Sequence, residues 1–454
     1  MSRLRYSFTV LLVNLISYIL VETLQRLDNY SFVFCSLLSL MAVVIQLWAL
    51  RRYVGALLSP YPIFMISFVV FNFGLFWIYG LGIDFNYFYL NSFSSQQQIK
   101  GISFEMLCSG AMFLAGANCK TIKPFRMQQM SQCSESSVES FARMGLMIST
   151  LFAFALLFFK AHAFAQGLYE GVRQFERNVP TYISIIEYFF VPFSVLHMVY
   201  CRSASNKRNT MWLLIVWSVS TALLGDRTSG IGGILVATLI NFKYSGRQNQ
   251  NERIQKRNYI FLGLGIVTAF LLISVAGSFR EGNHFSDAST LFGVIGEMGG
   301  SFLPLLLIME ICPSIHPYLL GRSYFYTLLT GFIPETLDLT GIVHQGLNYV
   351  IEPIRWIESD FDYTFGTGYS LCAEAYANFG TWGFIALYFI GLLIIKVLQT
   401  DINRKFSVYT SMVMLFELFT LPRRNSYYIL NHSFYCILVM AALILIMTRR
   451  VNNR

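Results

Sequence analysis

The stretch LLGDRTSGIGGILVATL, residues 223–239, decides the fold of this chain. Its two ends are apolar, and between them lies a short polar turn that holds an aspartate and an arginine side by side, Asp226 and Arg227. Apolar segments joined by so short a turn are typical of a hairpin of membrane helices, because a backbone in lipid must satisfy its own hydrogen bonds. Charged side chains are costly in that setting, so this pair is the first candidate for a functional site.

The composition places the rest of the chain in a lipid bilayer as well. Of its 454 residues, 55% are hydrophobic and only 13% are charged, and the mean hydropathy is +0.54. A soluble domain of that size cannot hide so much apolar surface. The net charge of +9 is typical of the Lys and Arg excess in cytoplasmic loops of membrane proteins, so no nucleic-acid partner is expected.

Repeated apolar runs near the ~20 residues needed to cross a bilayer predict an all-α, polytopic integral membrane protein with about twelve transmembrane helices. We interpret residues 1–454 as a single transmembrane domain. The predicted spans are 6–24, 32–50, 62–80, 102–118, 144–160, 181–200, 211–225, 229–242, 259–276, 383–399, 408–421 and 432–447.

The distribution of basic residues predicts the orientation of these spans. If the N-terminus faces the cytoplasm, most of the 33 Lys and Arg residues fall in the segments on the cytoplasmic side. This bias favours a topology with both termini in the cytoplasm. It also places one long segment, residues 277–382, on the periplasmic side as a large loop.

That loop contains two stretches, 289–311 and 324–333, that are apolar enough to lie on the membrane or dip into it. Loops of this length inside compact proteins are usually functional. The alternative is a surface cap, and for the loop as a whole we favour a functional role.

The two spans around the opening stretch are short. Residues 211–225 and 229–242 each cover roughly 21–23 Å at ~1.5 Å per residue, less than the ~30 Å hydrocarbon core. This length predicts that the turn lies below the outer surface, where Arg227 would face a cavity or a partner. Two alternatives stay open: Asp226 neutralises Arg227 in a structural turn, or the helices begin earlier than these spans.

External arginines are a second signal, because the positive-inside bias selects against them. A guanidinium group binds phosphate through two parallel hydrogen bonds and keeps its charge. One such residue alone is more typical of a side chain that reaches the lipid headgroups, whereas several on one side favour an anionic substrate at the outer leaflet. The external arginines are Arg26, Arg173, Arg177, Arg227, Arg280, Arg322, Arg355, Arg423 and Arg424.

The segment ESDFDY, residues 358–363, contains a D-x-D pair, Asp360 and Asp362. Two such carboxylates can hold a divalent cation. A single pair in a long loop is a weak signal, and we interpret it as an ordinary acidic turn, so no metal site and no cofactor are predicted. The chain also has no Walker loop, HExxH or GxSxG motif, which argues against an ATP-driven pump, a zinc protease and a serine hydrolase.

Several stretches resemble one protein family. They are GDRTSG (225–230), GSFREG (277–282), IGEMGGS (295–301), LGRSYFYTLLTGFIP (320–334) and AEAYANFGTWGFIALYFIGLL (373–393). Together with the twelve-span layout, they resemble the O-antigen polymerases, the Wzy-type oligosaccharide repeat-unit polymerases of bacterial envelopes. The motifs cover most of the second half of the chain, and the first half resembles the family by hydropathy.

The resemblance implies a glycosyltransferase of lipopolysaccharide biosynthesis at the periplasmic face of the bacterial inner membrane. It would transfer the growing glycan from undecaprenyl pyrophosphate to the next lipid-linked repeat unit. Its partners would be that lipid-linked oligosaccharide, membrane lipids and a chain-length regulator protein.

Such a reaction needs positive charge on the leaving diphosphate and a general base for the attacking sugar hydroxyl. The shortlist for the base is Glu281, Glu297, His344 and Glu374, and each is otherwise a hydrogen-bonded structural group. We expect catalytic roles for Arg227, Arg280, Glu297 and Glu374. We expect substrate binding by Arg173, Arg177, Arg322, His344, Arg423 and Arg424.

Three alternatives remain. A ligase that hands finished chains to a lipid acceptor would have nearly the same sequence features. A glycosyltransferase that uses a polyprenyl-phosphate sugar is the second, with Asp84 as its base. A flippase for the lipid-linked unit is the third, and the long external loop and the lack of a visible internal repeat argue against it.

Overall fold

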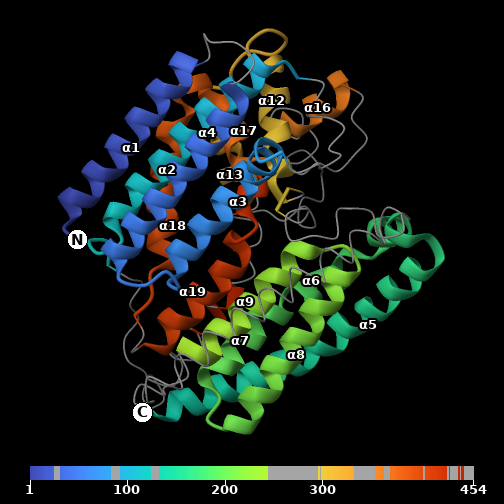
Figure 1. The fold of residues 1–454 in the computed structure, drawn as a ribbon. Helices are drawn as coiled ribbons and strands as arrows, with labels where there is room; N and C mark the ends of the chain where they lie inside the picture. Colours follow the sequence, from blue (N-terminus) through green and yellow to red (C-terminus); the bar gives the residue numbers. More distant parts are fainter. Residues whose placement is uncertain are drawn as a thin grey trace. The chain divides into compact units, whose positions relative to one another are not determined.

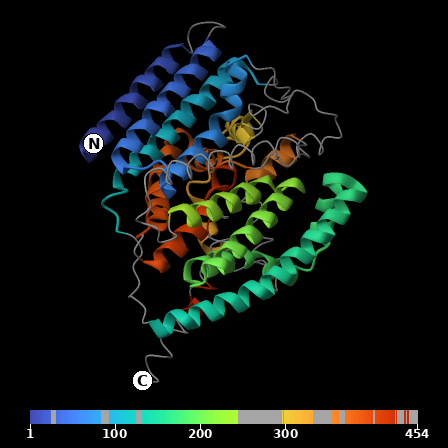
Figure 2. The same ribbon diagram turned by 60° about the horizontal axis from the view of Figure 1, so that its bottom comes forward.

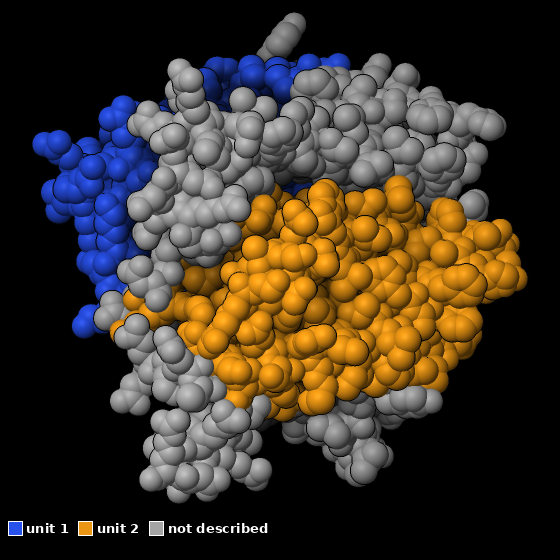
Figure 3. Space-filling model, turned by 90° about the horizontal axis from the view of Figure 1, so that it is seen from below, with its two compact units in different colours: residues 1–123, 292–399, 418–431 blue, residues 124–291, 400–417, 432–454 orange. Residues whose placement is uncertain are grey.

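The computed structural model describes residues 1–24, 31–82, 93–123, 132–243, 295–331 without Glu297, 353–361, 369–401, 404–426 and a few positions between 429 and 443. In this part of the chain every regular element is a helix, and no strand occurs. The chain divides into two compact units, drawn in blue and orange in Figure 3. Unit 1 comprises residues 1–123, 292–399 and 418–431, and unit 2 comprises residues 124–291, 400–417 and 432–454.

The predicted spans coincide with helices wherever the structure describes the chain; the spans at 259–276 and, for the most part, 432–447 lie outside the described residues. Unit 1 contains α1 (Arg3–Leu24), α2 (Ser31–Val54), α3 (Pro60–Gly80), α4 (Ser95–Ala115), α12 (Phe302–Ile311), α13 (Arg322–Gly331), α16 (Pro353–Phe361), α17 (Leu371–Phe379) and α18 (Gly383–Leu398). Unit 2 contains α5 (Gln132–Asn178), α6 (Thr181–Tyr188), α7 (Phe190–Tyr200), α8 (Ala204–Leu223), α9 (Arg227–Lys243) and most of α19 (Lys405–Leu418).

Helices α1 to α4 lie side by side in unit 1, as Figures 1 and 2 both show. Hydrogen bonds join the N-terminal end of α1 to the C-terminal end of α4. The Arg3 guanidinium donates to Asn118 Oδ1 at 2.7 Å, and the Tyr6 hydroxyl donates to the Phe113 carbonyl at 2.6 Å. The two helices therefore run antiparallel, as alternating membrane spans require.

The outward faces of these helices are apolar. On α1, Leu4 is 82% exposed and Phe8 is 64% exposed, and on α2 Met41 is 61% exposed. Side chains of this kind are stable on an outer face only where lipid covers it. Six helical stretches of the described chain are long and apolar enough to cross a membrane, and one of them joins α17 to α18 over residues 371–398. The protein is therefore an all-α polytopic membrane protein.

The first apolar stretch of the predicted periplasmic loop ends up inside unit 1. All of α12 from Phe302 to Ile308 is buried, and the helix packs against α3, α4 and α17. Just before it, a Cβ on Gly299 would lie 1.8 Å from the Leu75 backbone nitrogen. The glycine of the IGEMGGS stretch thus lets two backbones touch, and α12 is covered by protein rather than by the membrane surface.

Helix α5 has 47 residues, more than twice the ~20 that cross a bilayer. Near its C-terminal end the Phe159 and Phe175 rings stack with centroids 6.2 Å apart, and Lys160 Nζ lies 3.1 Å from Glu176 Oε1. In a straight α-helix positions 160 and 176 would lie about 24 Å apart. The end of α5 therefore folds back on itself, which is visible in Figures 1 and 2.

The hairpin of the opening stretch differs from its prediction. Helix α8 has 20 residues and begins at Ala204, so it covers about 30 Å. The helix thus begins seven residues before the predicted span at Met211, as the alternative of an earlier start expects. The added residues 204–210 are mostly polar, however, and α8 is not among the helices of the described chain that are long and apolar enough to cross a membrane. The turn itself is tight: Gly225 has a φ of +111°, and Asp226 Oδ1 accepts a hydrogen bond from the Ser229 amide at 3.2 Å. Asp226 therefore caps the first turn of α9.

Candidate functional site

Glu374 is a predicted site residue with several hydrogen-bond partners in the structure. It lies in the first turn of α17, where the Ser370 hydroxyl caps the helix by accepting from the Cys372 and Ala373 amides. Its side chain is 1% exposed. A buried carboxylate is costly unless hydrogen-bond donors surround it, so its neighbours define what it can do.

Hydroxyl and amide donors hold the Glu374 carboxylate. Oε1 accepts from Ser426 Oγ at 2.7 Å and from Ser323 Oγ at 2.9 Å, while Oε2 accepts from the Ser426 amide at 2.6 Å. Ser323 comes from α13, and Ser426 follows the short helix η7 (Leu421–Arg423). Three segments that are distant in sequence thus meet at one carboxylate.

Asn378 sets the direction of the hydroxyl protons in this cluster. Its Nδ2 donates to Ser323 Oγ at 2.7 Å, so the Ser323 proton is left to point at Glu374. Its Oδ1 in turn accepts from the Gly321 amide at 3.0 Å, which fixes the side chain. The cluster therefore presents Glu374 as a hydrogen-bond acceptor, the state that a general base requires.

An apolar groove of about 580 Å³ lies next to this cluster in unit 1. Hydrophobic side chains of α13, α17 and α18 form most of its wall, and the polar groups on it include the Ser426 and Thr327 side chains, whose oxygens are 3.3 Å apart. The residues around the groove are Tyr324, Thr327, Leu328, Phe379, Trp382, Ile385, Ala386, Phe389, Ile390, Leu393, Ser426 and Ile429. Ser426 thus touches both the groove and Glu374.

Three predicted arginines belong to the segments that build the cluster. Arg322 directly precedes Ser323 and is exposed, and Arg423 and Arg424 stand just before Ser426. The Arg423 carbonyl accepts from the Tyr369 amide at 3.1 Å, which ties this segment to the start of α17. The fold therefore gathers the backbones of these arginines around Glu374.

Unit 2 gathers a different set of predicted residues. Lys160 Nζ lies 3.1 Å from Glu176 Oε1 and 3.6 Å from Glu187 Oε2, and it is close enough to Asp226 for their charges to interact. Arg173 and Arg177 lie in the folded-back end of α5, and Arg227 follows Asp226; of these three arginines the structure describes the backbone only. Arg173 and Arg177 are four residues apart in this helix.

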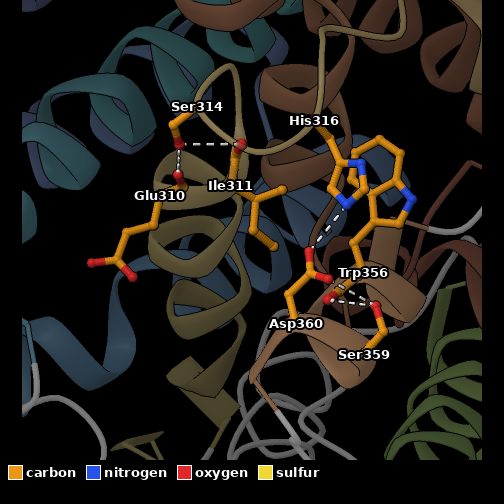
Figure 4. A network of polar contacts seen from close by, with 7 residues as sticks. All are labelled: Glu310, Ile311, Ser314, His316, Trp356, Ser359 and Asp360. Atoms are coloured by element: carbon orange, nitrogen blue, oxygen red, sulfur yellow. Dashed lines mark hydrogen bonds and ion pairs between the residues drawn. The ribbon is translucent and has the colours of Figure 1, made fainter.

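Of the remaining predicted residues, only Asp360 lies in the described part of the chain. The residues outside it are Asp84, Arg280, Glu281, Glu297, His344 and Asp362. Asp360 lies in α16, where its Oδ2 is 3.0 Å from His316 Nε2, and His316 stacks on Trp356 with ring centroids 4.6 Å apart (Figure 4). Asp360 therefore belongs to a helix and pairs with a histidine, rather than lying in an acidic turn.

Sequence reasoning missed the polar partners of Glu374. Ser323, Asn378 and Ser426 all stand in stretches that the sequence singles out, next to Arg322, in AEAYANF and after Arg424. The candidates in those stretches were charged residues, and these three neutral side chains were not among them. Ser323 and Ser426 contact Glu374 across 51 and 52 residues of sequence. A local sequence pattern does not indicate contacts between such distant positions.

The fold and site define a multi-pass, all-α membrane protein with a buried carboxylate beside an apolar groove. The model of one protein family, the O-antigen polysaccharide polymerase Wzy, matches residues 4–454. The chain therefore belongs to the Wzy family of O-antigen polymerases, which act on lipid-linked oligosaccharide repeat units in membranes. No curated protein and no solved structure shows significant similarity to the chain.

Proposed function

We propose that this protein polymerises repeat units at the periplasmic face of the inner membrane by transferring the growing glycan from undecaprenyl pyrophosphate to the next lipid-linked unit. The observation that carries the proposal is the contact of Ser426 with both the apolar groove and the Glu374 carboxylate. A substrate with a long apolar chain and a reacting polar head needs this combination of surfaces.

In this proposal the groove takes up part of the polyprenyl chain of a lipid-linked substrate. Its exposed wall residues include Leu328, Phe389 and Leu393, which are apolar and open to the outside of unit 1. Such a chain already lies in the bilayer, so van der Waals packing against these side chains, and not transfer out of water, would hold it in the groove. The head of the lipid would then lie at the end of the groove where Thr327 and Ser426 stand.

Glu374 acts as the general base through Ser426. The attacking sugar hydroxyl gives its proton to Ser426 Oγ as the Ser426 proton moves to Glu374 Oε1 along the 2.7 Å hydrogen bond. The freed oxygen forms the new bond to the anomeric carbon of the donor glycan, and the bond from that carbon to the diphosphate breaks. The electron pair of the broken bond leaves with undecaprenyl pyrophosphate.

The leaving diphosphate gains negative charge, and arginines stabilise it. Arg322, Arg423 and Arg424 are the candidates in unit 1, because the cluster holds their backbones beside Ser323 and Ser426. Arg173, Arg177, Arg227, Arg280 and His344 are further candidates, with Glu297 as a second acidic group. Fixed cations supply this stabilisation without a metal ion, so the polymerase activity of chelator-treated protein is expected to persist.

Purified protein in liposomes tests the proposal. Supplied with lipid-linked repeat units in detergent-free membranes, it is expected to form polymer and release undecaprenyl pyrophosphate. A flippase would move the unit without lengthening it, and a ligase would lengthen nothing without a second lipid acceptor. In cells, loss of the protein is expected to leave lipopolysaccharide with single repeats, whereas loss of a flippase leaves none.

The periplasmic placement has its own test. A reporter that is active only outside the cytoplasm is expected to work when fused at Gln345 and to fail at Gln250, because the basic residues cluster around the second site. Reversed signals would move the chemistry to the cytoplasmic side. A chain-length regulator is proposed as a partner, to be checked by co-purification.

A further inference from the structure

A second pocket of unit 1 is polar, unlike the groove. It has a volume of about 490 Å³, within the range of ligand sites, and helices α1, α4, α12 and α17 surround it. Its wall consists of Tyr18, Glu22, Gln97, Lys100, Ser103, Phe104, Leu107, Leu306, Met309, Glu310, Tyr376 and Thr381. We infer that this pocket binds sugar residues of the glycan, at a distance from the reacting bond.

The pocket combines the two kinds of surface that a sugar needs. Aromatic rings can stack on the apolar C–H face of a pyranose, and carboxylates and amides can accept and donate to its hydroxyls. The Tyr376 ring meets Phe104 edge-to-face with centroids 5.2 Å apart and Tyr318 at 6.1 Å. These contacts hold the ring in one orientation at the pocket wall.

The acidic groups of the pocket are also held in place. Gln97 is fixed by the capping box at the start of α4, and its Nε2 donates to Glu310 Oε1 at 2.5 Å. In Figure 4 the Glu310 carboxylate points away from the pair formed by His316 and Asp360. On α1, Tyr18 and Glu22 lie one helical turn apart on the pocket wall.

Ser103 adds a hydroxyl-bearing residue to the pocket wall. The residue is 4% exposed, and its Oγ is buried and has no hydrogen-bond partner among the described residues. Buried polar atoms usually have a partner, because each lost hydrogen bond costs about 1–3 kcal/mol. A ligand hydroxyl would become that partner once the Ser103 side chain turns toward the pocket.

The charges of the wall favour a sugar over a phosphate. Glu22 and Glu310 provide two carboxylates, and Lys100 provides the one cation among the residues around the pocket. A phosphate would meet net negative charge there, whereas sugar hydroxyls donate to carboxylates. The ligand class is therefore the oligosaccharide itself and not the diphosphate or a lipid headgroup.

The position of the pocket suits a glycan that continues away from the reacting bond. Tyr376 is two residues after Glu374 on α17, so the two side chains leave the helix about 200° apart. The pocket and the Glu374 cluster thus lie on opposite sides of one helix. This inference rests on the proposed function for the identity of the ligand, because the substrate of that reaction carries both a polyprenyl diphosphate and a glycan.

A binding measurement tests the inference without requiring polymerisation. The probe is the lipid-free oligosaccharide released by mild acid from the lipopolysaccharide of the cells that make this protein. Its affinity for the full-length protein in neutral-lipid nanodiscs is measured by calorimetry and by saturation-transfer NMR. Glu22→Gln, Glu310→Gln and Tyr376→Leu are each expected to weaken binding on the order of tenfold or more, since charge-assisted hydrogen bonds and ring contacts are lost.

Two variants serve as controls. Gln96→Ala changes an exposed residue of α4 beside Gln97 and is expected to bind like the wild type, and so is Glu374→Gln, which leaves the pocket intact. Glu22 is half-buried, and Gln has nearly the same shape as Glu. The Glu22→Gln variant is therefore expected to fold without rearrangement of its neighbours. Unchanged affinity in all three pocket variants would overturn the inference, as would displacement of the probe by inorganic phosphate or anionic lipid.

The outcome separates this inference from the proposed function. If the protein polymerises lipid-linked units while the pocket variants bind the probe normally, the pocket assignment fails and the polymerase proposal stands. If the probe depends on these residues but no polymer forms in liposomes, the pocket assignment stands and the polymerase proposal fails.

Discussion

Each of the two units holds a charged side chain in a largely apolar surrounding, but the partners of that side chain differ. In unit 1 a carboxylate, Glu374, is held by neutral donors: two serine hydroxyls and one amide. In unit 2 a cation, Lys160, lies between the carboxylates of Glu176 and Glu187. Both arrangements satisfy a charged group in a largely apolar protein, but they leave different chemistry available.

The difference lies in what can move. Serine hydroxyls exchange protons readily with a carboxylate, and the direction of the Ser323 hydroxyl is set by Asn378. The positive charge of a lysine between two carboxylates is balanced by them. Such an ammonium group keeps its protons and does not act as a base. In the proposed mechanism, proton transfer therefore belongs to the Glu374 cluster and Lys160 has a structural role. The arginines of unit 2 would supply its positive charge to the substrate.

The largest effect is expected for Glu374→Gln. The amide keeps the shape of the side chain but cannot accept a proton, so polymerisation is expected to fall on the order of 10²–10⁴-fold in the liposome assay. Glu105→Gln is the matched control, because Glu105 is also fully buried in unit 1 and lies on α4. If both variants lose activity equally, the loss reflects a buried carboxyl in general and Glu374 is not the base.

Arg227→Ala is expected to come next. Removing one charge-assisted donor from a water-excluded transition state typically costs on the order of 10²–10³ in rate, and lipopolysaccharide would carry single repeats while the protein inserts normally. Arg227→Lys keeps the charge and loses the planar fork, so it retains partial activity at best. A normal chain-length distribution after Asp226→Ala with Arg227→Leu would contradict a catalytic role for Arg227.

A smaller effect, on stability alone, is expected for Lys160→Met. Methionine fills a similar volume but leaves Glu187, whose side chain is 15% exposed, without its cation. The midpoint of thermal unfolding in detergent is expected to fall, because a partly buried charge loses its compensation. The rate per folded molecule is expected to stay at the wild-type value. A large drop in rate at unchanged stability would make Lys160 part of the chemistry and remove the contrast between the units.

The smallest effect is expected at the cap of α9. Asp226→Ala removes the acceptor for the Ser229 amide, and loss of such a cap costs about 1 kcal/mol. Asp226→Asn keeps an acceptor oxygen at the same place and is expected to unfold at nearly the wild-type temperature. Equal destabilisation by both variants would show that the negative charge matters more than the cap.

The sequence by itself determined the membrane class, the family and most of the long apolar helices, because hydropathy is a local property and an apolar segment in lipid must satisfy its own backbone hydrogen bonds, as a helix does. It did not predict the short helices α12, α13, α16 and α17 of the long loop. The sequence also selected Glu374 and the arginines beside it, since charges stand out against an apolar background. Only the tertiary structure decided which of these residues meet. Ser323 and Ser426 are far from Glu374 in sequence, and neutral hydroxyls carry no pattern of their own. The early start of α8, the fold-back of α5 and the polar pocket are likewise set by packing between distant segments, where side-chain fit and hydrogen bonding override the local signal.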